Sequence, residues 1–262
     1  MRRVLRSDPA LEYLIRLPAG TGHAPRVMVS VHGASREWRA QVAAIAAHCD
    51  RENMMLLAPM MNERTLPSFQ RLGGGAKRSD LFLAECLREA AHLSGADVSQ
   101  IFLFGHSGGA QFAHRFTMAY PHRVHACVIA SAGWYTFPDT AQRFPYGIRS
   151  TRRLPGMVFD PEQYLQVPIF VLVGTEDTGE RRVRHGERVD AQQGANRLER
   201  ARRWTAAMRE QAALFSMPPR VELTELPGVG HEFQALCRDA ALGERVFHLF
   251  HPISKQEVRH EA

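Results

Sequence analysis

The stretch IFLFGHSGGAQFAHRF, residues 101–116, decides the fold of this chain. It begins with apolar residues typical of a buried strand, passes through GHSGG at 105–109, and continues into a pattern typical of a helix. The order Gly-x-Ser-x-Gly at a turn from strand to helix holds the serine, Ser107, out above the strand end. The alternative interpretation is an ordinary tight turn that contains an incidental serine.

Apolar runs alternate with helical patterns along most of the chain. The expected strands are 26–33, 55–61, 100–105, 124–133, 168–174 and 220–226. The expected helices are 36–50, 78–94, 108–119, 189–213 and 232–250. Strands this apolar are typically covered on both faces, and right-handed crossovers between them build a parallel sheet. We therefore predict an α/β fold with three layers, a mostly parallel central sheet with helices on both faces.

Length and composition indicate a single domain that spans 1–262. A chain of 262 residues with 45% hydrophobic content is long enough for one large core. Its cysteines are far apart and form no CxxC pair, so we interpret them as small core residues: Cys49, Cys86, Cys127 and Cys237. Neither a run of signal-peptide length at the start nor a stretch of membrane-span length is present. We expect a cytoplasmic protein with no membrane partner.

The positive charge does not indicate a nucleic-acid partner. The formal net charge is +6, and the most basic run, ERRVRHGERVD at 180–190, mixes its arginines with Glu180, Glu187 and Asp190. Mixed charges of this kind, also present in the helical pattern that follows, are typical of a solvated helix face. A zinc knuckle or an aromatic RNA-binding run is absent from the sequence. We therefore expect no nucleic-acid partner.

The segment FGHSGGAQFAHRF resembles the nucleophile elbow of α/β-hydrolases, and the resemblance extends over nearly the whole chain. Together with VSVHGAS and IASAGWYTFPD, it is most similar to the branch of poly(3-hydroxybutyrate) depolymerase-like and feruloyl-type esterases. This resemblance implies the three-layer α/β-hydrolase fold. It also implies a serine esterase that uses no metal or organic cofactor and acts on carboxylic esters with a modest acyl group.

The same resemblance implies a catalytic triad in the chain order Ser, acid, His. The nucleophile is Ser107, the acid in GTED is Asp177, and the base in LPGVGHEF is His231. Glu176 is the local competitor for the acid, and the family pattern Gly-Thr-x-Asp favours Asp177. Each side chain follows an expected strand, and ligands of open parallel sheets bind beyond the carboxyl ends of the strands.

Two backbone N–H groups are expected to form the oxyanion hole. One belongs to Gly108, which follows the nucleophile at a helix N-terminus, where the dipole favours negative charge. The other maps by resemblance onto Ala34, in the loop after VMVSV. We interpret His32 and Gly33 as residues that shape this loop rather than react.

The segment 134–166 is rich in aromatic residues and is expected to form a short cap or a pocket wall. Trp134, Tyr135 and Phe137 are then the substrate-binding residues. The alternative is a surface loop that uses its aromatic rings to attach itself to the core.

These expectations combine into a serine carboxylic ester hydrolase that works through an acyl-enzyme on a small-molecule ester. Two alternatives remain open. One is a serine peptidase of the same fold, since the same triad and oxyanion hole serve an amide. The other is a non-catalytic ligand-binding protein on the same scaffold.

Overall fold

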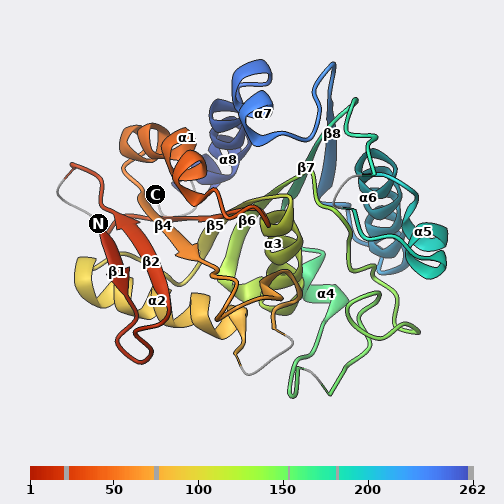
Figure 1. Ribbon diagram of the computed structural model, residues 1–262, viewed down its shortest axis with the longest axis horizontal. Helices are drawn as coiled ribbons and strands as arrows, with labels where there is room; N and C mark the ends of the chain where they lie inside the picture. The colour runs from red at the N-terminus through yellow and green to blue at the C-terminus, as the bar shows by residue number, and fades with distance from the viewer. Residues whose placement is uncertain (21–23, 74–76, 153, 181–182, 259–262) are drawn as a thin grey trace.

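The computed structural model describes residues 1–20, 24–73, 77–152, 154–180 and 183–258. Within these residues, eight strands form one sheet in the order β1-β2-β4-β3-β5-β6-β7-β8 (Figure 1). The strands are β1 (Arg2–Val4), β2 (Glu12–Arg16), β3 (Val27–Val31), β4 (Met55–Met60), β5 (Ile101–His106), β6 (Val124–Ala130), β7 (Ile169–Gly174) and β8 (Val221–Leu226). All neighbours from β4 to β8 pair in parallel, whereas β1 and β2 pair antiparallel.

Helices cover both faces of this sheet. They are α1 (Trp38–Arg51), α2 (Ser79–Ser94), α3 (Gly108–Ala119), α4 (Pro161–Tyr164), α5 (Glu187–Gln193), α6 (Arg197–Leu214), α7 (Phe233–Asp239) and α8 (Leu242–Val258). In Figure 1, α1, α7 and α8 lie above the sheet, and α2, α3 and α4 lie below it. The predicted three-layer α/β fold is therefore confirmed.

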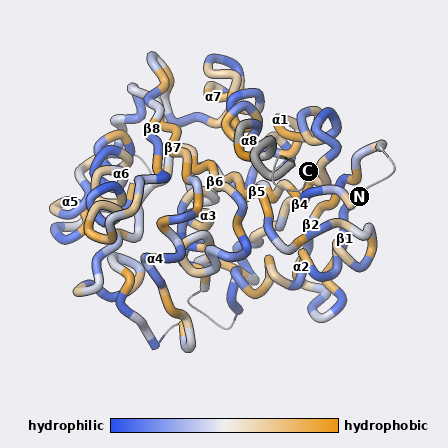
Figure 2. The backbone as a smooth tube through the Cα atoms, turned by 180° about the vertical axis from the view of Figure 1, so that it is seen from behind, coloured by the Kyte–Doolittle hydropathy of each residue, from blue (hydrophilic) through white to orange (hydrophobic). Residues whose placement is uncertain are grey.

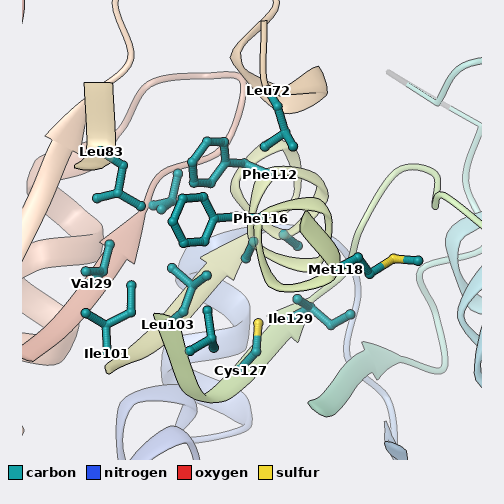
Figure 3. Packing of buried hydrophobic residues seen from close by; sticks show 14 of the residues in the cluster. Val29, Leu72, Leu83, Ile101, Leu103, Phe112, Phe116, Met118, Cys127 and Ile129 are labelled. Atoms are coloured by element: carbon teal, nitrogen blue, oxygen red, sulfur yellow. The ribbon is translucent and has the colours of Figure 1, made fainter. Parts of the chain in front are cut away.

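The parallel strands separate two hydrophobic cores because their side chains alternate between faces. In β5, Ile101 and Leu103 pack in the core beneath α2, α3 and α6, while Phe102 and Phe104 pack in the core beneath α1, α7 and α8. Figure 3 shows the first core, where Phe112 and Phe116 of α3 lie over the sheet. In Figure 2 the tube is hydrophobic along the central strands and mixed on the surrounding helices.

The sequence placed the parallel strands to within a few residues, but it missed β1 and β2 at the edge. These two strands are short, and β2 alternates partly exposed and buried residues. The helix expected over 189–213 is two helices, because Gly194 between α5 and α6 adopts a φ of +99°, which no helix contains. The helix expected over 232–250 is likewise divided into α7 and α8.

The structure also bears on two expectations from the sequence, that the cysteines are small core residues and that no segment has the length of a membrane span. Cys49, Cys86 and Cys127 are buried as free thiols, and Cys237 is partly buried. Among the described helices, none combines the length and the apolar composition that a bilayer crossing requires.

Candidate active site

Ser107 stands at the turn between β5 and α3, with a backbone φ of +52° and ψ of −110°. This conformation is strained for a serine, and it persists because close packing surrounds it. A Cβ on Gly109 would collide with the carbonyl oxygen of Val31, and a Cβ on Gly105 would collide with the backbone of Gly109. The two glycines therefore allow β3, β5 and α3 to approach one another while Ser107 stays at the strand end.

The loops after β7 and β8 are tied together by backbone hydrogen bonds. The N–H of Glu176 donates to the carbonyl of Val229 at 3.0 Å, and the N–H of Gly228 donates to the Thr175 hydroxyl at 2.9 Å. This arrangement brings Asp177 and His231 together, with 3.0 Å between Asp177 Oδ2 and His231 Nδ1. Because the carboxylate accepts, Nδ1 carries the proton, and the neutral imidazole keeps Nε2 as its acceptor.

Asp177 is almost completely buried yet charged. Burial alone raises the pKa of Asp177, but the hydrogen bond and charge of His231, together with the charge of Arg197, hold that pKa below its ordinary value. Arg197 Nη1 lies 3.2 Å from Asp177 Oδ1, so each carboxylate oxygen has its own partner. Glu176, the competing acid, is exposed. Among the hydrogen bonds that the structure records, its carboxylate makes none comparable to those of Asp177.

The two expected oxyanion donors lie next to each other. A Cβ built on Gly108 would be 2.9 Å from the backbone nitrogen of Ala34, and a Cβ on Gly33 would be 3.4 Å from Ser107 Cβ. The loop after β3 and the first turn of α3 therefore come together beside the serine. Preorganised backbone N–H groups at such a place can stabilise a developing oxyanion.

His32 fixes the conformation of the loop after β3 through two hydrogen bonds of its ring. It is buried, its Nδ1 donates to the carbonyl of Gly33 at 2.8 Å, and its Nε2 accepts the backbone N–H of Met61 at 3.0 Å. Burial lowers the pKa of His32 to about 4, so the ring is neutral and this tautomer is fixed. His32 thus connects the Ala34 loop to the end of β4, as its interpretation as a loop-shaping residue predicts.

Replacing His32 with alanine is expected to lower kcat by about tenfold or more with little change in KM, because the Ala34 N–H loses its fixed position. The buried N–H of Met61 also loses its acceptor, which costs roughly 1–3 kcal/mol of stability. Steady-state kinetics and thermal unfolding check both effects. An unchanged kcat alongside a lowered Tm would limit His32 to a structural role.

His106 packs directly against the candidate base. Its Nε2 donates to the backbone carbonyl of His231 at 3.1 Å, and the two imidazole rings stack with centroids 5.2 Å apart. Burial, followed by the charge of His231, lowers the pKa of His106 to about 3, so it stays neutral. On its other side the ring contacts Phe233, the first residue of α7. His106 therefore supports His231 without competing with it for a proton.

Ser107, Asp177 and His231 line one cavity of about 490 Å³. Gln70, Gln111 and Phe233 also line it, and none of these three was predicted from the sequence. Gln111 is four residues after Ser107 on α3, so helical spacing gave a signal for it. Phe233 is two residues after His231, so its place in the sequence also gave a signal, whereas Gln70 carries none.

The predicted aromatic substrate wall is wrong for this cavity. Trp134, Tyr135 and Phe137 are buried and are not among its described lining residues. The guanidinium carbons of Arg115 and Arg184 lie 4.4 and 5.2 Å from the ring centroid of Trp134. Tyr135 stacks on Trp204 of α6, and Phe137 belongs to the adjacent core. These rings attach the segment after β6 to the core, which is the alternative interpretation of the sequence. The described residues of 134–166 likewise contribute no lining to this cavity.

Comparison with known proteins gives a consistent picture of the fold. No protein-family model matches the chain, and no curated protein sequence matches it. Among solved structures, poly(aspartic acid) hydrolase-1 from Sphingomonas sp. KT-1 is 24% identical, with a TM-score of 0.75 over 88% of this chain and 91% of that one. LpqC, a poly(3-hydroxybutyrate) depolymerase from Bordetella parapertussis, is 26% identical, with a TM-score of 0.73 over 90% and 88%.

A more distant neighbour is FphF, a fluorophosphonate-binding serine hydrolase of Staphylococcus aureus. It is 12% identical, with a TM-score of 0.59 over 91% of this chain and 92% of that one. The strand order, the elbow at Ser107 and these neighbours agree with one another. The chain therefore has the α/β-hydrolase fold, which it shares with esterases, polymer hydrolases and serine hydrolases.

Proposed function

We propose that the protein is a serine hydrolase of carboxylic esters. Ser107 is the nucleophile, His231 is the general base and acid, and Asp177 orients the imidazole. The observation that most supports this proposal is the 3.0 Å hydrogen bond between Asp177 and His231 in the cavity that Ser107 also lines. The fold it shares with esterases and serine hydrolases adds support.

The first half of the reaction forms an acyl-enzyme. Ser107 Oγ attacks the ester carbonyl while Nε2 of His231 takes its proton, because a serine hydroxyl is a weak nucleophile at neutral pH. Asp177 keeps the proton of the imidazole on Nδ1 and stabilises the imidazolium that forms. The backbone N–H groups of Ala34 and Gly108 stabilise the negative charge on the tetrahedral oxygen. The imidazolium then protonates the departing alcohol.

The second half releases the acid. Water enters in place of the alcohol, His231 takes a proton from it, and the resulting hydroxide attacks the acyl carbonyl. The same two N–H groups, of Ala34 and Gly108, stabilise the second tetrahedral species. Its collapse returns the proton from His231 to Ser107 and frees the carboxylic acid. Every step is performed by residues of this chain and water.

The lining of the cavity supports small or aryl esters that are uncharged or cationic. Three exposed glutamates, Glu37, Glu176 and Glu232, line it together with the amide side chains of Gln70 and Gln111. A focused negative potential disfavours anionic substrates. A polyanion of the kind named for poly(aspartic acid) hydrolase-1 is therefore a poor candidate, in spite of the shared fold.

Hydrolysis of p-nitrophenyl esters from acetate to dodecanoate tests the proposal, alongside labelling of Ser107 by a fluorophosphonate probe. We expect labelling and a rate that falls with acyl length, because the cavity of about 490 Å³ accepts a small ligand. A second set of substrates, thioacetates whose thiol parts carry a trimethylammonium, tert-butyl or carboxylate group, isolates the effect of charge. We expect kcat/KM to be lowest for the carboxylate by about tenfold or more.

The outcomes separate the alternatives. Serine-dependent cleavage of amides without cleavage of esters would assign the protein to the peptidases of this fold. Folded protein that fails to label at Ser107 and cleaves no ester would contradict the proposal and favour a binding protein. Equal rates on the three thioacetates would contradict the charge preference alone.

A further inference from the structure

Arg197 is a buried arginine that contacts the candidate catalytic acid. It is the first residue of α6, and only 2% of its surface is exposed. Its Nη1 lies 3.2 Å from Asp177 Oδ1, on the opposite oxygen from His231, and 3.5 Å from the carbonyl of Gly179. It also lines the cavity that contains Ser107. A guanidinium therefore shares the carboxylate with the imidazole.

A buried arginine lowers the stability of the fold unless a partner compensates for the loss of its hydration. Moving a charge out of water is expensive, and a buried ion pair contributes little net stability compared with apolar side chains of similar size. The helix does not need the arginine to begin, because the Asn196 side chain caps α6 by accepting the N–H of Glu199 at 3.0 Å. Arg197 thus has a direct relation to Asp177 that helix formation does not explain.

We propose that Arg197 is a positioning residue of the active site, which anchors Asp177 and sets the pH range in which His231 works as a base. This inference rests on the proposed serine hydrolase function. An anionic Asp177 stabilises the charged form of His231, and the cation on its other oxygen weakens that stabilisation. The acid limb of kcat/KM, which depends on a base able to accept the proton of Ser107, is then expected at a lower pH than with Asp177 alone.

Other charged or titratable groups face the pair from the surrounding elements. His106 stacks on His231 from β5, and its pKa of about 3 keeps it neutral throughout the working range. Tyr135 after β6 is buried near Asp177, and burial and Asp177 raise its pKa far above neutral. The cavity is also lined by the carboxylates of Glu37, Glu176 and Glu232. All five are unchanged in a variant of Arg197, so a shift between the variant and the parent protein reports on the arginine.

The test is the pH profile of kcat/KM for p-nitrophenyl acetate in Arg197→Met and Arg197→Lys. For the methionine variant we expect the midpoint of the acid limb to rise by about one pH unit. At pH values below the midpoint, this shift lowers kcat/KM about tenfold. Activity should recover towards the parent value at pH values above the acid limbs of both proteins. Arg197→Lys keeps a cation near Asp177, so the midpoint of its acid limb should lie close to that of the parent protein.

Two control variants lie on the same helix. Arg200→Met removes another buried arginine, which binds the Gly194 and Gly133 carbonyls and Asp190 rather than Asp177. Arg203→Met removes one exposed charge. Neither should move the acid limb. If Arg197→Met does not fold by circular dichroism, Arg197→Gln, which keeps hydrogen-bond donors without the charge, replaces it in the same measurement.

The proposed function and this inference fail in different ways. If the parent protein neither labels at Ser107 nor hydrolyses esters, the proposed function is wrong. If the parent protein is active and the loss of the Arg197 charge lowers kcat/KM equally at every pH, Arg197 has only a structural role and the inference is overturned. A downward shift of the acid limb would overturn it as well.

Discussion

Ester hydrolysis is expected to vanish when either Ser107 or His231 is replaced with alanine. In the proposed reaction, Ser107 forms the bond to the acyl group and His231 carries its proton. The other serine and histidine that line the cavity are Ser35 and His106, and of the two histidines only His231 is hydrogen-bonded to Asp177 among the recorded contacts. Losses of roughly 10⁶-fold in kcat are typical for a nucleophile or its base. Initial rates on p-nitrophenyl acetate measure the loss, with the substrate concentration kept above KM.

The double variant makes this prediction sharper. Because Ser107 and His231 act as a unit, changing both to alanine should cost little more than changing one. His122→Ala and Ser99→Ala, both at exposed positions far from the cavity lining, are matched controls that should keep parent activity. If Ser107→Ala retains substantial hydrolysis while labelling by fluorophosphonate disappears, another group performs the hydrolysis and the assignment of the nucleophile is wrong.

The parallel half of the fold was predictable because its signals are local. Strands β3 to β7 are nearly continuous apolar runs, and the glycines around Ser107 mark a turn that few sequences allow. In β8, VELTEL, apolar residues are interspersed with polar ones. The edge strands β1 and β2 were missed because they lack such runs. Gly194, which divides α5 from α6, lies within a strongly helical pattern, where a single glycine is a weak signal.

The candidate site was predictable for residues that directly follow a strand. It was less predictable for residues whose burial depends on segments distant in the sequence. Ser107, Asp177 and His231 follow β5, β7 and β8. Arg197 lies in a stretch interpreted as a solvated helix face, because its neighbours are charged, yet both Arg197 and Arg200 are buried. Composition cannot distinguish a buried arginine from an exposed one, since the distinction depends on carboxylates and carbonyls from distant segments.

The aromatic rings after β6 illustrate the opposite error. Aromatic residues next to a predicted site suggest a pocket wall, but the same residues are equally suited to fill a core. Trp134 and Tyr135 use their rings against Arg115, Arg184 and Trp204, which the sequence places far away. The wall of the cavity is instead mostly polar, and the proposed preference for uncharged or cationic esters rests on that lining.

Asp177→Asn is expected to lower kcat by roughly 10³–10⁴-fold, whereas Glu176→Gln stays within about twofold of the parent protein. The carboxylate of Asp177 accepts the Nδ1 proton of His231, and an amide that presents its NH₂ group there favours the other tautomer. The imidazole then has its proton on Nε2 and cannot accept the proton of Ser107. Glu176 is exposed and has no contact with His231 among those recorded, so its loss leaves the tautomer unchanged.

The same substitution carries a second, independent signature in stability. Asp177→Asn removes the carboxylate charge that contacts the buried guanidinium of Arg197, and breaking a buried pair in this way costs roughly 3–5 kcal/mol. Ser107→Ala removes no such partner and should unfold close to the parent temperature, so it separates loss of chemistry from loss of stability. The combination Asp177→Asn with Arg197→Met removes both charges and should recover stability but not activity. If Glu176→Gln abolishes hydrolysis while Asp177→Asn is active, the acid is Glu176, and the hydrogen bond from His231 to Asp177 has only a structural role.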